Sequence, residues 1–190
     1  MGNNNQEEVS MIRALRLWDM GKIEEIDIGN FKGLQEIHYY LFNDIKGYNA
    51  GEIRTVNISK GGFLFASSLY LPQALKEIDG LPDQTFDEII NKYIEMNIAH
   101  PFIEGNGRST RIWLDLLLRT RLGKCVDWSA VDKLDYLTCM KLSPTQPKYI
   151  KALLSEALTE VIHSRQVYMK GIEQSYLYEG YGGRGFDDLI

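Results

Sequence analysis

The sequence predicts a mainly α-helical protein with a single domain and one β-hairpin. Its 190 residues match the length of one domain, and the 44% that are hydrophobic suffice for a core without metals or disulfides. Helix-start and helix-stop residues recur along most of the chain. Only the stretch GYNAGEIRTVNISKGGFLFASSLYL mixes glycines with β-branched and aromatic residues, which indicates a hairpin or an irregular flap.

The first part of the chain has three expected helices. Residues 1–9 are polar and are interpreted as a loose tail, after which Ser10 caps a helix that ends at Gly21. Hydrophobic residues at helical spacing predict a second helix over 33–45. Proline in the first turn and glycine at the end delimit a short third helix over 71–80.

The next helices have clearer boundaries. A T-x-x-E capping box opens a helix over 85–100, which Pro101 ends. Another helix is expected from Asn106 to Gly123, and a further one over 129–142. Pro147 precedes the next helical pattern, and a last helix leads into SYLYEGY.

Composition excludes several classes of protein. The net charge of −5 argues against a protein that coats nucleic acid or anionic membrane. No apolar run approaches the ~18 residues of a membrane span, and the start MGNNNQEEVS resembles no export or mitochondrial signal. We therefore expect a cytoplasmic location and no direct nucleic-acid or membrane partner.

Cysteine and histidine spacing argues against a zinc site. Cys125 and Cys139 form no C-x-x-C pair, so two reduced thiols are expected. The three histidines, His38, His100 and His163, form no H-x-x-x-H pair.

The segment HPFIEGNGRSTR, residues 100–111, carries the chemistry. Gly105, Asn106 and Gly107 tolerate unusual backbone angles at a helix start, where their N–H groups can form an anion-binding nest. Arg108 and Arg111 are three residues apart, so we expect both guanidinium groups near the same anion. One nest and two guanidinium groups suit a di- or triphosphate.

Two further side chains complete a transferase site. Glu104 is a hard oxygen ligand placed beside the nest, where Mg²⁺ bound to phosphate would lie. His100 ends the preceding helix, and an imidazole is suited to taking a proton near neutral pH. Each part alone is common in ordinary turns and helix ends, but together they indicate nucleotidyl or phosphoryl transfer. The P-loop motif is absent from the sequence.

HPFIEGNGRSTR matches every fixed position of H-x-F-x-[DE]-G-N-G-R-x-x-R, the signature of Fic domains, and YNAGEIR at 48–54 resembles the Fic segment before the flap. The resemblance covers roughly residues 30–180. It implies a mostly α-helical domain with a β-hairpin flap, about residues 52–68, over the active site. It also implies transfer of AMP from ATP, with Mg²⁺, to a Tyr, Thr or Ser hydroxyl of a target protein.

The resemblance assigns roles to the motif residues. His100 would take the proton from the target hydroxyl, Phe102 would anchor the core, and Glu104 would hold Mg²⁺. The anion hole would consist of Gly105, Asn106 and Gly107. Arg108 would bind the β- and γ-phosphates and Arg111 the γ-phosphate. Because the G-N-G-R stretch is intact, AMP transfer is favoured over transfer of phosphate.

Other residues are expected around the nucleotide. Lys60, near the flap tip, is placed to reach it or to stay solvated, and Asn97 lies one helical turn before His100, beside the adenosine. Leu137 and Met140 pack either the adenine or the core.

A second motif lies near the C-terminus. SYLYEG fits [ST]-x-x-x-E-[GN], the inhibitory motif of self-restrained Fic proteins, and its position resembles the class III group. Glu179 would pair with Arg111 and put ATP out of line for attack, while Ser175 would hydrogen-bond nearby. The chain then divides into a tail at 1–9, a Fic domain at 10–163, the inhibitory helix at 164–182 and a tail at 183–190.

Several alternatives stay open. Tyr176, Tyr178 and Tyr181 either pack the last helix or include a site of self-modification with AMP. An ATP-sensing, non-catalytic interaction module and an enzyme that removes AMP are the other functions considered. The resemblance also suggests a homo-oligomer and, as a target, a DNA topoisomerase.

Overall fold

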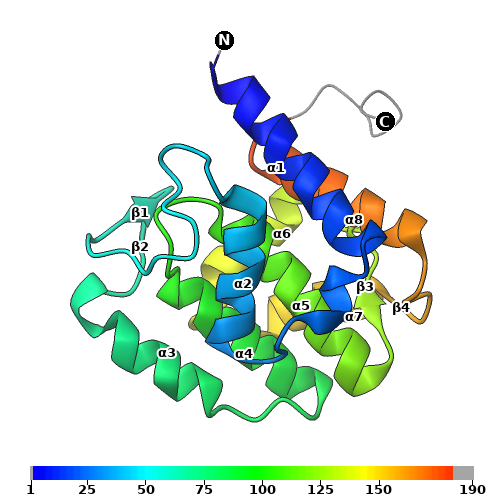
Figure 1. The fold of residues 1–190 in the computed structure, drawn as a ribbon. Helices are drawn as coiled ribbons and strands as arrows, with labels where there is room; N and C mark the ends of the chain where they lie inside the picture. The colour runs from blue at the N-terminus through cyan, green and yellow to red at the C-terminus, as the bar shows by residue number, and fades with distance from the viewer. Residues whose placement is uncertain (1, 182–190) are drawn as a thin grey trace.

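Helices dominate the computed structural model, which describes residues 2–181 of the chain (Figure 1). Eight α-helices and two small two-stranded sheets are found within those residues, as the sequence predicts for a mainly α protein. Helices α4 (Phe86–Ala99) and α5 (Asn106–Leu122) pack against each other, and α2 (Phe31–Phe42) packs on α5. The remaining helices are α1 (Gly2–Asp19), α3 (Leu71–Asp79), α6 (Lys133–Leu142), α7 (Lys148–Glu156) and α8 (Arg165–Tyr178).

The centre of the core is α5, which is buried on several faces. Its buried residues include Trp113 and Leu117, and its first turn contributes buried polar residues as well. A helix that is apolar on several faces is stable only inside a bundle. The burial of α5 therefore fixes the position of the 100–111 motif, which ends in its first two turns.

Local sequence signals explain the boundaries of α4. The predicted capping box is present: the Thr85 hydroxyl accepts from the Glu88 N–H at 3.3 Å, and the Glu88 carboxylate accepts from the Thr85 N–H at 2.9 Å. At the other end, His100 adopts a left-handed backbone with φ 48°, and Pro101 prevents a further turn.

Helix α1 differs from the prediction. Residues 2–9 belong to this helix, so the loose tail expected over 1–9 is wrong for them, and Ser10 lies inside the helix instead of capping it. The Glu7 side chain is buried, and its carboxylate accepts from the Tyr48 hydroxyl at 2.5 Å. These stabilising contacts are with residues distant in the sequence, which no local pattern indicates. The tail expected at 183–190 lies outside the described residues.

The predicted flap contains a short hairpin. Strands β1 (Ser59–Lys60) and β2 (Phe63–Leu64) pair antiparallel around Gly61 and Gly62, whose φ angles are 55° and 78°. Glycine is favoured at both turn positions because positive φ strains other residues.

A second sheet was not expected from the sequence. Strands β3 (Cys125–Val126) and β4 (Leu158–Thr159) pair antiparallel although α6 and α7 separate them in the sequence. Two-residue strands are too short to show an alternating pattern. Both cysteines are free thiols, as predicted. Among the described residues, no helix has both the length and the apolar character needed to cross a membrane.

Candidate active site

A cavity of about 360 Å³ lies between the flap, α4, the start of α5, α6 and the end of α8, and its volume is within the range of small-ligand sites. It brings together most of the predicted site residues. Those that line it are Lys60, Asn97, His100, Glu104, Asn106, Gly107, Arg111, Tyr178 and Glu179, with Leu137 and Met140 of α6.

The Gly-Asn-Gly segment forms a tight turn into α5. Gly105 has φ 78°, and a Cβ there would lie 2.4 Å from the ring of Phe42, so a larger residue does not fit. The Asn106 side chain joins both backbone groups of Phe102, accepting from its N–H at 2.9 Å and donating to its carbonyl at 2.8 Å. This loop is therefore shaped by Asn106, as predicted.

His100 lies at the cavity wall in a defined orientation. Its carbonyl accepts from Arg54 Nε at 2.7 Å, and its ring stacks on Phe65 of the flap with centroids 3.7 Å apart. The Nδ1 atom lies 3.2 Å from the Asn97 carbonyl, which can only accept, so Nδ1 carries the proton and Nε2 is left as an acceptor. Burial lowers the pKa of His100 to about 4, which keeps the imidazole neutral near pH 7.

Glu104 has an exposed side chain and a backbone carbonyl that is held by a hydrogen bond. Its side chain is 51% exposed, and Oε1 accepts from the Gly105 N–H at 3.1 Å. The Glu104 carbonyl accepts from His38 Nε2 at 2.8 Å, and the His38 Nδ1 accepts from the Gly51 N–H at 2.9 Å. Among the residues that the structure describes, no three metal-binding side chains cluster. A single carboxylate is nevertheless a fitting ligand for Mg²⁺ that shares its shell with phosphate oxygens and water.

Arg111 is held by the last helix. Its Nε donates to the Ser175 hydroxyl at 2.8 Å, and its Nη2 donates to the Ser175 carbonyl at 3.1 Å. The Glu179 Oε1 atom lies 3.7 Å from Arg111 Nη2, and Glu179 Oε2 lies 2.6 Å from Lys60 Nζ. A Cβ on Gly107 would lie 2.7 Å from Glu179 Oε1, so a larger residue there would displace this carboxylate.

The charge of Glu179 is maintained by its neighbours. Burial alone would raise its pKa, but Arg111 and Lys60 lower the pKa below its usual value. Glu179 is therefore an anion inside the cavity. The contact of Lys60 with Glu179 was not predicted, since the sequence suggested the nucleotide or solvent for Lys60.

Arg108 does not line the cavity, which differs from the expectation that both arginines face one anion. Its side chain is buried on the side of α1, where Nη1 donates to Glu7 and Nη2 donates to the Tyr48 hydroxyl at 2.8 Å. Glu7 belongs to the segment 2–9, which is helical in the structure although the sequence predicted a loose tail there.

The three tyrosines near the C-terminus contribute to packing. Tyr176 and Tyr178 are buried, with hydroxyls that donate to Ser10 Oγ at 2.7 Å and to the Val131 carbonyl at 2.6 Å. Tyr181 is half-buried and its ring lies near the Arg108 guanidinium. Their modification stays a prediction.

Sequence reasoning missed several cavity residues, among them Phe65, Tyr136 and Lys141. Phe65 covers His100, the Tyr136 hydroxyl pairs with that of Tyr93, and Lys141 Nζ donates to the Gly61 carbonyl at 3.3 Å. The available signal was helical spacing, because Lys141 follows Leu137 by one turn.

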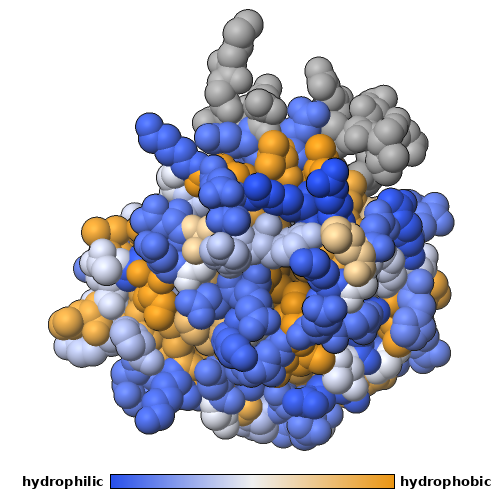
Figure 2. Space-filling view, viewed as in Figure 1, coloured by the Kyte–Doolittle hydropathy of each residue, from blue (hydrophilic) through white to orange (hydrophobic). Residues whose placement is uncertain are grey.

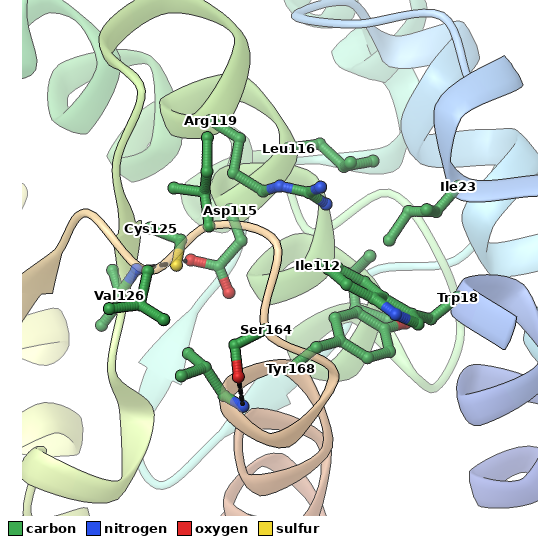
Figure 3. Close-up of a pocket in the computed structure, with 13 residues that line it drawn as sticks. Trp18, Ile23, Ile112, Asp115, Leu116, Arg119, Cys125, Val126, Ser164 and Tyr168 are labelled. Carbon is green, nitrogen blue, oxygen red and sulfur yellow. Dashed lines mark hydrogen bonds between the residues drawn. The ribbon is translucent and has the colours of Figure 1, made fainter. Parts of the chain in front are cut away.

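A second, smaller void of about 20 Å³ contains none of these residues (Figure 3). Asp115 of α5 lines it, and its carboxylate accepts from the Val126 N–H at 3.0 Å and from Trp128 Nε1 at 2.7 Å. Burial raises the pKa of Asp115 to about 7. A void of this size has room for about one water molecule, so we assign it no ligand.

Comparison with known proteins identifies the domain. Residues 30–118 match the model of the Fic/DOC family. Protein adenylyltransferase VbhT of Bartonella schoenbuchensis is 28% identical over 185 residues, which cover 88% of this chain and 37% of that protein. The probable protein adenylyltransferase Fic of Escherichia coli is 32% identical over 111 residues, 53% of this chain and 54% of that protein. The chain thus spans about half or less of the length of these relatives.

Solved structures agree with this assignment. The Bartonella tribocorum effector protein BepC, crystallised with bound AMPPNP, superimposes with a TM-score of 0.66 at 21% identity, over 82% of this chain and 87% of that one. The N-terminal Fic domain of a Bep effector from Bartonella sp. AR 15-3 gives a TM-score of 0.70 at 19% identity, over 84% of each chain. Residues 30–118 therefore form a Fic domain, and the chain has the fold of the Fic/DOC family.

Proposed function

We propose that this protein transfers AMP from ATP to a hydroxyl side chain of a target protein and that Glu179 inhibits the reaction. The observation that carries the proposal is the cavity itself. It places a neutral His100 with a free Nε2, the Gly-Asn-Gly turn and the Arg111 guanidinium around one space. The names of the curated relatives, which include protein adenylyltransferases, support the same reaction.

In this reaction His100 is the general base. Its Nε2 takes the proton from the target hydroxyl while the hydroxyl oxygen forms a bond to the α-phosphorus of ATP. The bond from that phosphorus to the bridging oxygen breaks, and pyrophosphate leaves. The hydrogen bond from Nδ1 to Asn97 keeps the acceptor nitrogen directed away from the helix end. Backbone N–H groups of the turn and the Arg111 guanidinium stabilise negative charge on the phosphates.

Glu104 is the residue that would hold Mg²⁺. The ion supplies charge neutralisation on the phosphates when bound. The side chain is exposed to the cavity, whereas His38 and Gly105 fix the backbone around it. A fixed backbone keeps the carboxylate near the nest, where the phosphates would lie.

Glu179 inhibits by charge and by competition. Its carboxylate lies near Arg111 and Lys60, which are the cations that line the cavity beside it. A triphosphate would meet this negative charge and would lack Arg111 as a partner. ATP held with its α-phosphate out of line does not react, because in-line geometry dominates the barrier.

The flap is the proposed contact for the target. An extended target segment pairs with a hairpin edge through main-chain hydrogen bonds, which sets register without demanding much sequence. The topoisomerase target, the homo-oligomer and the cytoplasmic location remain predictions from the sequence.

The test is a gel assay with α-labelled ATP and Mg²⁺. It compares the parent with Glu179→Gly and Glu179→Gly/His100→Ala, using cell lysate as the source of targets. The control is Glu160→Gly, because Glu160 has an 81% exposed side chain and lies outside the cavity lining. We expect label only with Glu179→Gly. Equal label in the parent and Glu179→Gly would reject inhibition, and no label in any lane would reject AMP transfer.

The two alternative functions predict other outcomes. An ATP-sensing interaction module would keep its biological effect in His100→Ala. An AMP-removing enzyme would release AMP from a modified target, with Glu179 placing the attacking water, and Glu179→Gly would then lose activity.

A further inference from the structure

Arg108 lies in an aromatic cage outside the cavity. The carboxylate of Glu7 and the hydroxyl of Tyr48 accept from its Nη atoms. Four rings lie with centroids between 4.8 and 5.6 Å from its guanidinium carbon. We call this group of residues the Arg108 cage: Glu7, Phe42, Tyr48, Tyr176 and Tyr181.

The cage does not satisfy Arg108 fully. Among the described residues, Arg108 Nε is buried and has no hydrogen-bond partner. A buried N–H group on a cation that lacks an acceptor costs free energy. Besides Glu7 and Tyr48, only Glu104 Oε1, 3.7 Å from Nη2, offers a charged oxygen to Arg108 among the described residues. A ligand with several charged oxygens, such as a triphosphate, would offer more acceptors than these groups. The cage is therefore suited to retaining Arg108 until a stronger partner can reach it.

The cage joins the first and last helices. Glu7 comes from α1, and Tyr176 comes from α8. These helices lie side by side (Figure 1), and Trp18 of α1 stacks on Tyr168 of α8 with centroids 4.8 Å apart (Figure 3). Further contacts along their length are Tyr176 to Ser10 at 2.7 Å, Tyr168 to the Ala14 carbonyl at 2.8 Å, and Arg165 to Asp19 at 2.6 and 2.8 Å.

We propose that Glu7 is a second inhibitory carboxylate, which holds Arg108 away from the nucleotide while Glu179 occupies Arg111. The inference rests on the proposed function, together with the role that the resemblance to Fic domains implies for Arg108, which is to bind the phosphates of ATP. Each arginine at the start of α5 is held by a carboxylate from a different end of the chain. Because α1 and α8 are joined along their length, the two carboxylates leave the site as one unit.

The test measures the dissociation constant of ATP with Mg²⁺ by calorimetry. It compares the parent, Glu7→Gln and Glu8→Gln, each alone and in the Glu179→Gly background. Glu8 is the matched control, since it is the next acidic residue on α1 and lies outside the cage. We expect Glu7→Gln to tighten ATP binding about fivefold and Glu8→Gln to leave it unchanged. Unchanged or weaker binding by Glu7→Gln would overturn the proposal.

The double variant tests the coupling of the helices. If α1 and α8 leave together, Glu7→Gln and Glu179→Gly tighten ATP binding by less in combination than the product of their separate factors. Full multiplication of the two factors would show that each carboxylate acts alone and would overturn the coupling.

Two further controls separate the possible failures. If Glu7→Gln lowers the unfolding temperature, the ATP measurement is repeated with Tyr48→Phe. This variant removes the hydrogen bonds of Tyr48 with Glu7 and Arg108 but keeps the aromatic ring. We expect Tyr48→Phe to bind ATP more tightly as well. If Glu179→Gly binds ATP but transfers no AMP, the proposed function is rejected and the role of Glu7 in ATP binding is not. Transfer by Glu179→Gly, with ATP affinity unaffected by Glu7→Gln, would reject the role of Glu7 only.

Discussion

The ammonium of Lys60 lies 2.6 Å from Oε2 of Glu179, so an ion pair joins the flap tip to the end of α8 across the mouth of the cavity. The two side chains differ in burial: Lys60 is 67% exposed and Glu179 is 15% exposed. An ion pair with one solvated partner contributes at most about 1 kcal/mol. We therefore expect the interaction of Glu179 with the buried Arg111 to be stronger than its ion pair with Lys60.

Replacing Lys60 should relieve inhibition only slightly. We expect Lys60→Met to raise AMP transfer less than about fivefold, since a solvated ion pair is weak, whereas Glu179→Gly should raise it by more than about tenfold. The measurement is label incorporation from α-labelled ATP. Lys46→Met is the control, because Lys46 is exposed and does not line the cavity. If Lys60→Met activated AMP transfer as much as Glu179→Gly, the ion pair with Lys60 would not be the weaker of the two interactions of Glu179.

The titration of His100 should occur at low pH. Burial lowers its pKa to about 4, and the nearby charge of Glu179 opposes that shift, so Glu179→Gly should keep the pKa low. Nitrogen and ring-proton NMR of the free protein between pH 3.5 and 8, with His100→Gln for assignment, gives the value. We expect a neutral ring down to about pH 5. A midpoint near 6.5 would show that the ring is solvated.

The same shift predicts how stability depends on pH. The pKa of His100 is lower in the folded protein than in the unfolded chain, so the folded state binds fewer protons between about pH 4 and 6.5. The contribution is present above the unfolded pKa and is lost as the pH falls through this interval. Denaturant unfolding should therefore show a steeper loss of stability on acidification than in His100→Gln. Parallel curves for the two proteins would contradict the assignment.

A packing change on α8 should loosen inhibition without touching the cavity. A Cβ on Gly171 would lie 3.1 Å from Cδ1 of Trp128, so Gly171→Ala forces a small displacement of α8 at a cost on the order of 1 kcal/mol. We expect faster deuterium exchange in α8 and a severalfold rise in AMP transfer. Gly80→Ala is the control, because its Cβ would make an ordinary contact at 3.5 Å. Equal exchange in both variants would show that α8 tolerates the methyl group.

Self-modification should require release of the last helix. The hydroxyls of Tyr176 and Tyr178 are both hydrogen-bonded while α8 is docked. We therefore expect peptide mass spectrometry to find no AMP adduct in the parent, and an adduct on one of the three C-terminal tyrosines in Glu179→Gly/Gly171→Ala. Adducts at equal yield in the parent would show that docking does not protect these residues.

Local signals in the sequence predicted the parts of the fold that depend on neighbours in the chain. Thr85 and Glu88 form the predicted capping box, and Asn106 shapes the loop between α4 and α5 as expected. The contact between Glu179 and Arg111 was also anticipated, because a motif marks each partner. The capping box and the Asn106 loop depend on short-range geometry that a single sequence contains. Arg111 and Glu179 are far apart in the chain, and only the resemblance to Fic domains paired them.

Contacts between distant segments could not be predicted in this way. Strands β3 and β4 pair although two helices separate them in the sequence. Residues 2–9 are helical, and Glu7 among them contacts Tyr48, which is distant in the sequence. Arg108 then turns toward Glu7, which helical spacing alone would not indicate. In each case a tertiary contact decides the conformation, and the local preference of the residues does not indicate that contact.

The position of Glu179 at the end of α8 has a consequence for protein synthesis. The other cavity residues extend only to Ser143 on the N-terminal side of α8, so they emerge from the ribosome first. The 36 residues from Pro144 to Glu179 take about 2 to 7 s to translate at ordinary rates of elongation. At the start of that interval a nascent chain has all the cavity side chains except Tyr178 and Glu179. In the proposed function, the inhibitory carboxylate is therefore the last part of the cavity to be synthesised.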